Sequence, residues 1–389
     1  MSSLFRPTCM RIALALSSAL VLYTVLSILF HYASDYSLLI SIARSVVWIG
    51  ATAVLYAAVK QLHRGSILDL LIDVMIAQSV IIVFSMLFPD FKSMTDAFRS
   101  DSTIERGEKY SGYRALGLSG SAFFGLAICY GFSYLLIAYH WREWNISNPI
   151  LKVLIVILLV VAGSSAGRTS QIGLIVAILL FVGMMGMGKM PRNIRFKKKN
   201  IVIVSVSLAL VVVFIPFLGE LSISGTVEYF VTYATSFFAN FNPSDILSST
   251  SSTQTLSTMY FPLSFDQLIA GDGLYEINGS YYMGTDAGYM RTVLYFGVLG
   301  LVLMCAVQFS LLYMGTGKRE MAFFLSTVLL LLVFQYKGEA IMTPVSLSAL
   351  MLLTAFDVRN RESGFLPELS LDYGGRQLTE QKWEGDFER

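Results

Sequence analysis

The chain has 389 residues, of which 55% are hydrophobic and only 14% are charged, and its formal net charge at pH 7 is +2. A soluble domain carries about 25% charged residues, so this composition, with a mean hydropathy of +0.65, excludes an ordinary soluble protein. The small net charge, together with basic residues that gather beside apolar runs, argues against a nucleic-acid-binding protein.

Apolar runs of about twenty residues recur along the chain, and each can cross the ~30 Å hydrocarbon layer as a helix. They fall at 10–30, 37–59, 67–88, 116–139, 149–163, 171–188, 201–218, 288–314, 321–336 and 340–356. The first run is too long for a signal-peptide core and should remain as a membrane helix. We therefore predict an all-α polytopic membrane protein with about ten transmembrane helices. Residues 1–356 form the membrane-embedded domain and residues 357–389 a polar tail.

Basic residues lie in alternate loops. These residues are Lys60 and Arg64, then Arg142, then the cluster 189–199, then Lys318 and Arg319. The positive-inside rule places these loops in the cytoplasm, which predicts a bacterial inner-membrane protein with both termini cytoplasmic. The long outside loops are then 89–115 and 219–287, the larger one between the seventh and eighth helices, and function is sought there first.

Five cations lie within or beside apolar runs, all toward the predicted outer face. They are Arg44, Arg114, Arg168, Arg291 and Lys337. A cation near hydrocarbon is costly unless it is paired or hydrated, so such residues usually line a polar interior. The set predicts an electropositive cup open to the outside. The alternative is that each side chain reaches the lipid headgroups or pairs with a nearby carboxylate.

Arg168 lies in a run of small and polar residues, 162–171, between two apolar runs. Small residues let the backbone approach a ligand, and the start of the following helix offers free amide groups to an anion. Arg114 occupies the corresponding position where the first outside loop re-enters the membrane. Because arginine can engage two phosphate oxygens at once, both residues are candidate phosphate ligands.

The outside loop 219–287 is acidic and aromatic. It contains Asp272, Glu276 and Asp286 among its carboxylates, many Tyr and Phe residues, and no Lys or Arg. Aromatic faces with carboxylates suit sugar rings, which have apolar faces and hydroxyl edges. The alternative is an interfacial aromatic belt on a loop that the topology rule keeps acidic.

Three local patterns resemble the O-antigen polymerase (Wzy) family, which is related to the O-antigen ligases. The first is RALGLSGS at 114–121, and the second is SSAGRTS at 164–170. The third is GDG at 271–273, followed by TDAGY at 285–289 and FGVLG at 296–300. Arg106 and Gly117 also have the Arg-x10-Gly spacing of some of these polymerases.

The resemblance implies a membrane glycosyltransferase of GT-C-like architecture that uses a lipid-linked donor. It would transfer a growing glycan from undecaprenyl pyrophosphate to a lipid-linked repeat unit at the periplasmic face. The candidate general bases are Asp286, Asp272 and Glu276. The candidate substrate-binding residues are Arg168, Arg114, Arg291, Arg106, Arg44, Lys337 and Tyr289.

The resemblance implies lipid-linked oligosaccharides and membrane lipid as partners, with a chain-length regulator and a flippase as further ones. The energy already resides in the pyrophosphate bond, so no cofactor is expected. The three cysteines and three histidines are scattered, so no metal is expected either. The ligases carry an essential histidine in the large outside loop, and 219–287 contains none. A ligase, a flippase for lipid-linked oligosaccharide and a non-catalytic assembly protein remain the alternatives.

Overall fold

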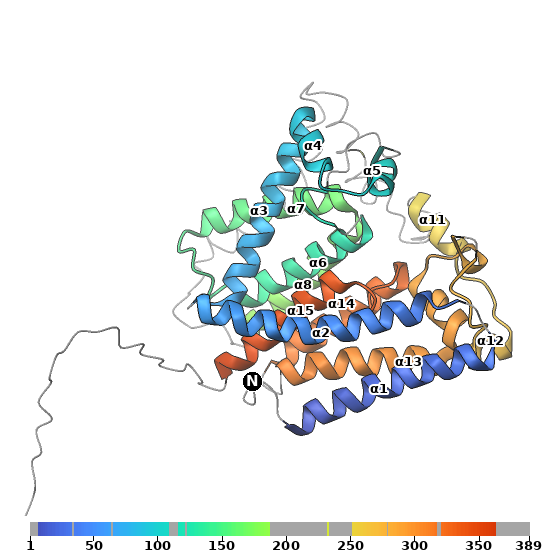
Figure 1. Cartoon of the computed structure of the whole chain (residues 1–389). Coiled ribbons are helices and arrows are strands. Elements are labelled where there is room, and N and C mark those ends of the chain that lie inside the picture. Colours follow the sequence, from blue (N-terminus) through green and yellow to red (C-terminus); the bar gives the residue numbers. More distant parts are fainter. Residues whose placement is uncertain are drawn as a thin grey trace, which may run out of the picture.

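The computed structural model describes residues 7–32, 35–63, 65–108, 116–120, 123–186, 232, 251–277, 279–316 and 320–362. These residues form an all-α protein with one small hairpin (Figure 1). The first eight helices are α1 (Pro7–Phe30), α2 (Ser37–Leu62), α3 (Ile67–Leu87), α4 (Pro89–Asp96), α5 (Asp101–Glu108), α6 (Phe124–His140), α7 (Pro149–Ala166) and α8 (Thr169–Gly186).

The later elements are α11 (Ser251–Thr258), α12 (Phe265–Ile269), β1 (Glu276–Ile277), β2 (Ser280–Tyr281), η2 (Tyr282–Gly284), α13 (Gly288–Thr316), α14 (Met321–Lys337) and α15 (Val345–Glu362). Each predicted apolar run except 201–218 coincides with a described helix. The run 201–218 lies outside the described residues.

Two helices differ from the predicted ranges. The run predicted at 116–139 becomes helical only at Phe124, and residues 116–120 are not helical. The last helix begins at Val345 and continues to Glu362, so residues 357–362, assigned to the polar tail, belong to the bundle. Apolar composition marks a run but cannot locate its ends, which depend on backbone bonds made elsewhere in the fold.

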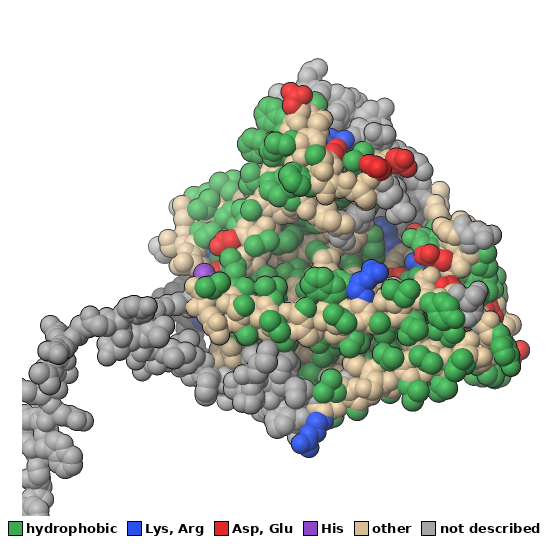
Figure 2. Space-filling model, viewed as in Figure 1, with side chains coloured by type: hydrophobic (Ala, Val, Ile, Leu, Met, Phe, Trp, Pro, Cys, Tyr) green, Lys and Arg blue, Asp and Glu red, His purple; other side chains and the backbone are tan. Residues whose placement is uncertain are grey.

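Four of the described helices, α2, α3, α7 and α13, are long and apolar enough to cross a membrane. Shorter apolar helices cover Leu14–Phe30, Phe124–His140, Thr169–Met184 and Met321–Lys337. Large apolar side chains also stand exposed on the outer surfaces of α1, α2 and α3, which show as extensive hydrophobic areas in Figure 2. A helix that is apolar on both its inner and outer faces is typical of a membrane-embedded bundle.

Hydroxyl groups in these helices bond back to their own backbone. Each of the following donates to the carbonyl four residues earlier: Thr24, Ser41, Ser45, Thr52, Ser79, Ser85, Ser133, Thr292, Thr316, Thr327 and Thr354. Such bonds satisfy a hydroxyl without water, so an apolar helix can carry Ser and Thr at low cost.

The closest helix pair is α6 with α8. If Gly173 of α8 were replaced by alanine, the added methyl group would lie 2.2 Å from the Cα atom of Gly131 on α6. The two backbones are therefore in direct contact. Only small residues allow this approach, which is the usual way in which membrane helices pack tightly. Helix α14 closes over the crossing, since a methyl group on Gly131 would also meet the ring of Phe334.

The bundle has two polar ends. We call one of them the Arg291 end. It contains the end of α1, the start of α2, the α7–α8 turn, the start of α13 and the α14–α15 junction. At the other, the Asp357 end, α2 and α15 finish and α3 starts. The Asp69 carboxylate of α3 accepts a hydrogen bond from His140 at the end of α6, so Asp69 makes a polar helix contact there.

Asp357 is fully buried and joins α15 to α2 and α3. Its carboxylate lies 3.3 Å from the Lys60 ammonium and 3.2 Å from Nε of Arg361, and it accepts a hydrogen bond from Ser66. The Tyr56 hydroxyl lies 3.4 Å away. One buried carboxylate thus joins its own helix to the segment where α2 ends and α3 begins, about 300 residues earlier in the chain.

Asp357→Ala should destabilise the folded protein by about 3 kcal/mol, the lower end of the range for breaking a buried ion pair, because Lys60 and Arg361 stay partly hydrated. Thermal denaturation of the detergent-solubilised protein measures the change. Glu143→Ala is the matched control: Glu143 also pairs with Arg361 but is mostly exposed, so its loss should cost under ~1 kcal/mol. Equal melting temperatures for the two variants would contradict a stabilising role for Asp357.

Candidate functional site

Helix α13 is broken at Gly297. The φ and ψ angles of this residue are 71° and −177°, whereas the residues before and after it are helical. A left-handed φ is readily adopted only by glycine. The break leaves the carbonyl groups just before it without helical partners, and in an apolar environment each must find another donor.

The Gly-Asp-Gly segment 271–273 supplies two of those donors. The Asp272 amide donates to the Leu294 carbonyl at 2.5 Å, and the Gly273 amide donates to that of Tyr295 at 3.3 Å. Gly271 has a φ of 73°, and a methyl group on it would lie 2.5 Å from the Tyr295 carbonyl oxygen. The glycines noted in the sequence at 271–273 and 296–300 therefore form one junction, where a loop backbone caps a broken helix.

Helix α1 holds this junction from the other side. The Tyr23 hydroxyl donates to the Phe296 carbonyl at 2.7 Å, and the His31 imidazole lies 2.9 Å from the Gly271 carbonyl oxygen. Asp35 accepts hydrogen bonds from the amides of Tyr275 and Glu276. Burial alone would raise the Asp35 pKa, but these bonds and those from Ser37 outweigh it, so the pKa is lowered and the carboxylate stays ionised.

Arg291, in the first turn of α13, is the centre of a cluster that also contains Tyr275, Tyr281, Glu276 and Glu339. Its Cζ atom lies 3.8 Å from the centre of the Tyr275 ring and 4.0 Å from that of Tyr281. Its Nη1 atom lies 3.3 Å from Glu339, and Nη2 lies 3.6 Å from Glu276. We call these five residues the Arg291 cluster. Rings and carboxylates on several sides hold the guanidinium in a fixed orientation.

One edge of this guanidinium makes no hydrogen bond within the described residues, although Glu276 lies 3.6 Å from its Nη2 atom. The Arg291 side chain is only 8% exposed, yet Nε and Nη2 have no hydrogen-bond acceptor among the residues that the structure describes. These two atoms form the edge with which arginine makes paired bonds to a carboxylate or phosphate. The cluster therefore offers a desolvated, oriented pair of donors.

Glu339 is the most enclosed acid of the cluster. Burial raises its pKa, while the Arg291 charge and a hydrogen bond from the Tyr275 hydroxyl lower it. Burial also raises the Tyr275 pKa, so the phenol stays protonated and can donate. Sequence reasoning missed Glu339, although an acid two residues after Lys337, between the last two apolar runs, was a signal that could have revealed it.

The three predicted acids have different surroundings. Asp272 accepts hydrogen bonds from the Gln267 amide at 2.8 Å and the Tyr282 hydroxyl at 3.1 Å, which suits a structural carboxylate. Glu276 lies beside Arg291 and is partly exposed. Asp286 is exposed, but the protein on one side of it partly desolvates the carboxyl and raises its pKa, against the lowering effect of Arg291 and Lys337.

The Thr285 hydroxyl holds the turn that precedes α13. The Thr285 hydroxyl oxygen accepts the Ala287 amide at 3.3 Å, and the same hydroxyl donates to the Met259 carbonyl at 3.1 Å. The carboxylate of Asp286 is thus left with the nearby Arg291 and Lys337 cations as its electrostatic partners.

Arg168 lies in the turn between α7 and α8, half-buried and already in contact with other groups. Ser164, Ser165, Thr169 and Gln171 around it are buried, and the Gln171 amide donates to the Ser164 hydroxyl. The predicted hinge of small and polar residues is therefore an interior polar turn.

A series of close contacts joins this turn to the start of α13. A methyl group on Gly167 would lie 3.2 Å from the Ala127 side chain, one turn along α6 from Phe124. One on Gly338 would lie 3.0 Å from the Phe124 ring, and one on Gly288 would lie 2.5 Å from the Gly338 carbonyl oxygen. The Arg168 turn, the end of α14 with Lys337, and the Arg291 helix thus pack around the start of α6.

The structure places the other predicted binding residues differently. Lys337 is the last residue of α14 and is half-buried, and the Tyr289 hydroxyl donates to the Leu332 carbonyl of α14. Arg44 is exposed on the surface of α2 and belongs to none of the contacts described above. Arg106 belongs to α5, but its side chain lies outside the described residues, as does the whole of Arg114.

Residues 116–118 lie against the middle of α3. The Gln78 side chain donates to the Leu116 carbonyl at 2.7 Å and accepts from the Leu118 amide at 3.1 Å. The Arg99 guanidinium donates to the Gly117 carbonyl and pairs with Asp96. Gly117 has a φ of 56°, and a methyl group there would lie 2.6 Å from the Gln78 amide nitrogen, so any other residue would strain the backbone and displace the Gln78 side chain. Sequence reasoning did not identify Gln78 or Arg99, which hold this re-entrant segment.

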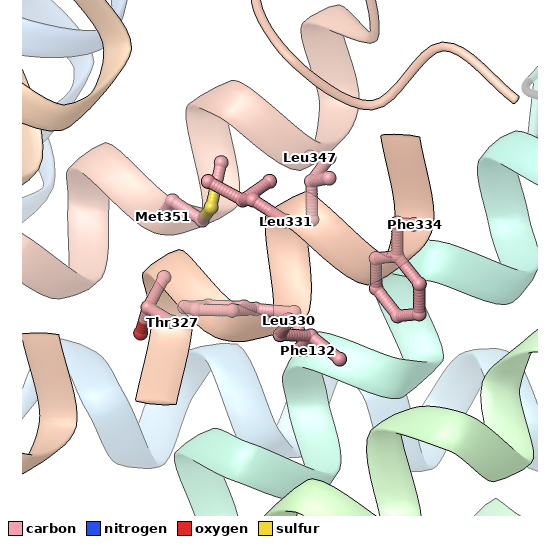
Figure 3. Close-up of a pocket in the computed structure, with 7 residues that line it drawn as sticks. All are labelled: Phe132, Thr327, Leu330, Leu331, Phe334, Leu347 and Met351. Atoms are coloured by element: carbon pink, nitrogen blue, oxygen red, sulfur yellow. The ribbon is translucent and has the colours of Figure 1, made fainter. Parts of the chain in front are cut away.

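A narrow apolar seam lies elsewhere, between α6, α14 and α15, and it has no room for a water molecule. It is lined by Phe132, Thr327, Leu330, Leu331, Phe334, Leu347 and Met351 (Figure 3). No charged residue is among them, so the seam could not hold a phosphate and belongs to the close-packed helix core.

Comparison of the chain with protein-family models, with curated proteins and with solved structures gave no match.

Proposed function

We propose that the chain is a polysaccharide polymerase of the bacterial inner membrane, with a GT-C-like bundle of about ten membrane helices. It transfers a growing glycan from undecaprenyl pyrophosphate to a lipid-linked repeat unit at the periplasmic face, which is the Arg291 end. Lipid-linked oligosaccharides are its substrates, and a chain-length regulator and a flippase act beside it. The observation that carries this proposal is the Nε–Nη2 edge of Arg291, which makes no hydrogen bond within the described residues and is buried among two tyrosines and two carboxylates.

The transfer needs the features found around Arg291. An acceptor hydroxyl attacks the anomeric carbon of the donor, the bond from that carbon to the pyrophosphate oxygen breaks, and the lipid pyrophosphate leaves with the bonding electrons. The hydroxyl proton passes to a general base. Arg291 and Arg168 stabilise the charge that develops on the leaving group, which is usually the largest catalytic contribution in such steps. Tyr281, which is exposed on one side, offers a ring face to a sugar.

Asp286 is the best placed of the three candidate bases. Asp272 is held by two hydrogen bonds and Glu276 is paired with Arg291, whereas Asp286 is exposed at the start of the same helix. Its raised pKa makes it a stronger base than an ordinary aspartate.

Asp286→Asn should lower the rate of elongation by about 10²–10⁴, the usual contribution of a general base. The rate of the unaltered protein should fall as the pH drops through the raised Asp286 pKa, since protonation removes the base. Chain elongation measured against pH checks both effects. Thr285→Ala is the control, because it removes the hydroxyl that holds the turn before α13 but no titrating group, and it should leave the pH profile in place. Full activity in Asp286→Asn would exclude Asp286 as the proton acceptor.

The alternatives are separated by one experiment. Purified protein is reconstituted into vesicles with lipid-linked repeat units and lipid A, and glycan length, lipid translocation and transfer to lipid A are followed. Elongation supports the polymerase. Translocation without elongation indicates a flippase, transfer to a lipid A acceptor indicates a ligase, and neither activity indicates a non-catalytic assembly protein.

A further inference from the structure

Helix α12 carries an exposed apolar stripe in a loop that the sequence assigns to water. Phe265, Leu268 and Ile269 are 74%, 40% and 54% exposed. Their spacing of three and four residues places them on one face of the helix. Three large apolar side chains on one face of a five-residue helix form a surface that water does not favour.

The position of α12 along α13 indicates what meets this stripe. A methyl group on Gly297 would lie 2.0 Å from the Ile269 carbonyl oxygen, so the end of α12 touches the break in α13. Gly297 is nine residues after Gly288, the first residue of α13, which corresponds to about 13 Å along the helix axis. The stripe therefore lies beside a part of α13 that is well past the first turns of that helix. Helix α13 is long and apolar enough to cross a membrane.

The stripe also continues the apolar surface of its neighbours. Val298 and Leu299, directly after the break, are exposed, as are Leu29 and Phe30 at the end of α1. If α13 crosses the bilayer, these side chains face acyl chains. The exposed apolar face of α12 then adds to the same surface.

Several backbone groups at the ends of α12 are bonded within the chain. The Ser264 side chain accepts the Gln267 amide, and the Gln267 side chain accepts the Ser264 amide, which completes a capping box. At the other end, the amides of Ala270 and Gly271 donate to the carbonyls of Asp266 and Gln267. These bonds satisfy part of each end, and a helix at the boundary between headgroups and acyl chains keeps its other end groups within reach of water.

We propose that α12 lies in the membrane at the Arg291 end, with Phe265, Leu268 and Ile269 in contact with the acyl chains of membrane lipids. Asp266, which is exposed on the same helix, sets the depth at the boundary between headgroups and acyl chains. The loop before α13 therefore re-enters the membrane and does not stand wholly in water. This inference does not depend on the proposed catalytic activity.

Spin labelling tests it. A nitroxide is attached to cysteine at Phe265 or Ile269, in a chain whose three cysteines are replaced by alanine, reconstituted in phosphatidylethanolamine–phosphatidylglycerol vesicles. Oxygen partitions into acyl chains and a nickel chelate stays in water. We expect collisions with oxygen to be more frequent than collisions with the chelate at both positions. Val298→Cys, on the exposed face of α13, is the control for a label in acyl chains and should give the same result. Ser280→Cys, on the hairpin, is the control for a label in water and should give the opposite result. Leu268→Cys gives a third position if one label disturbs the fold.

Two results would overturn the inference. More frequent collisions with the nickel chelate would place α12 in water. Few collisions with either reagent would show that protein covers the stripe, from residues 201–218 of the chain or from a second copy.

Discussion

Arg291→Lys should reduce elongation about 10²–10³-fold, the usual cost of removing one oriented donor from a transition-state site. Lysine keeps the charge, but it lacks the planar group that lies against Tyr275 and Tyr281 and the paired donors of the Nε–Nη2 edge. Elongation of lipid-linked repeat units by expression-matched protein measures the effect. A glycan ladder of normal length and rate would show that charge alone suffices and would remove the paired-donor argument.

Arg291 also stabilises the fold, so its two roles must be separated. Arg291→Ala leaves Glu339 and Glu276 without their cation and should lower the melting temperature, because unpaired buried carboxylates are costly. Adding Glu339→Gln removes the more enclosed negative charge and should recover most of that loss. We expect elongation to stay absent in the double variant. Recovery of both stability and elongation would mean that Arg291 acts only through the fold.

Arg168→Lys should fail almost as completely as Arg168→Ala, with elongation again lowered about 10²-fold or more. A pyrophosphate group needs partners that are permanently charged and bind two oxygens, which lysine does not provide. If Arg168 only reached the lipid headgroups, lysine would replace it freely, since both side chains have a long apolar stem. The length distribution of the glycan made by each variant decides between the two.

Arg142→Lys is the matched control for this pair of variants. Arg142 is an exposed arginine directly after α6, at the Asp357 end of the bundle, so its exchange should leave the ladder unchanged. Loss of elongation in this control as well would point to a general effect of arginine replacement on insertion or folding.

Part of the candidate site could be predicted from the sequence. The glycines at 271–273 and 296–300 and Asp286 stood in short patterns of unusual composition, and Arg291 was one of five cations beside apolar runs. The structure joins the two glycine segments at the break in α13 and places Asp286 and Arg291 at the start of the same helix. The Arg168 hinge was visible because small and polar residues interrupt apolar runs. The roles within the site could not be assigned in the same way. Asp272 looked equivalent to Asp286, but the bonds from Gln267 and Tyr282 distinguish it.

The sequence by itself determined the class of the protein and the approximate place of its helices. In an apolar medium each helix satisfies its backbone within one continuous segment, so local composition is enough to reveal it. The tertiary structure alone decided that α13 breaks at Gly297, that Arg291 is buried among Tyr275, Tyr281 and Glu339, and that Asp357 belongs to the bundle. Each of these depends on partners far apart in the chain, such as Tyr23 and Phe296, which are 273 residues apart. Local composition carries no record of such pairs, because they form only when packing brings the segments together.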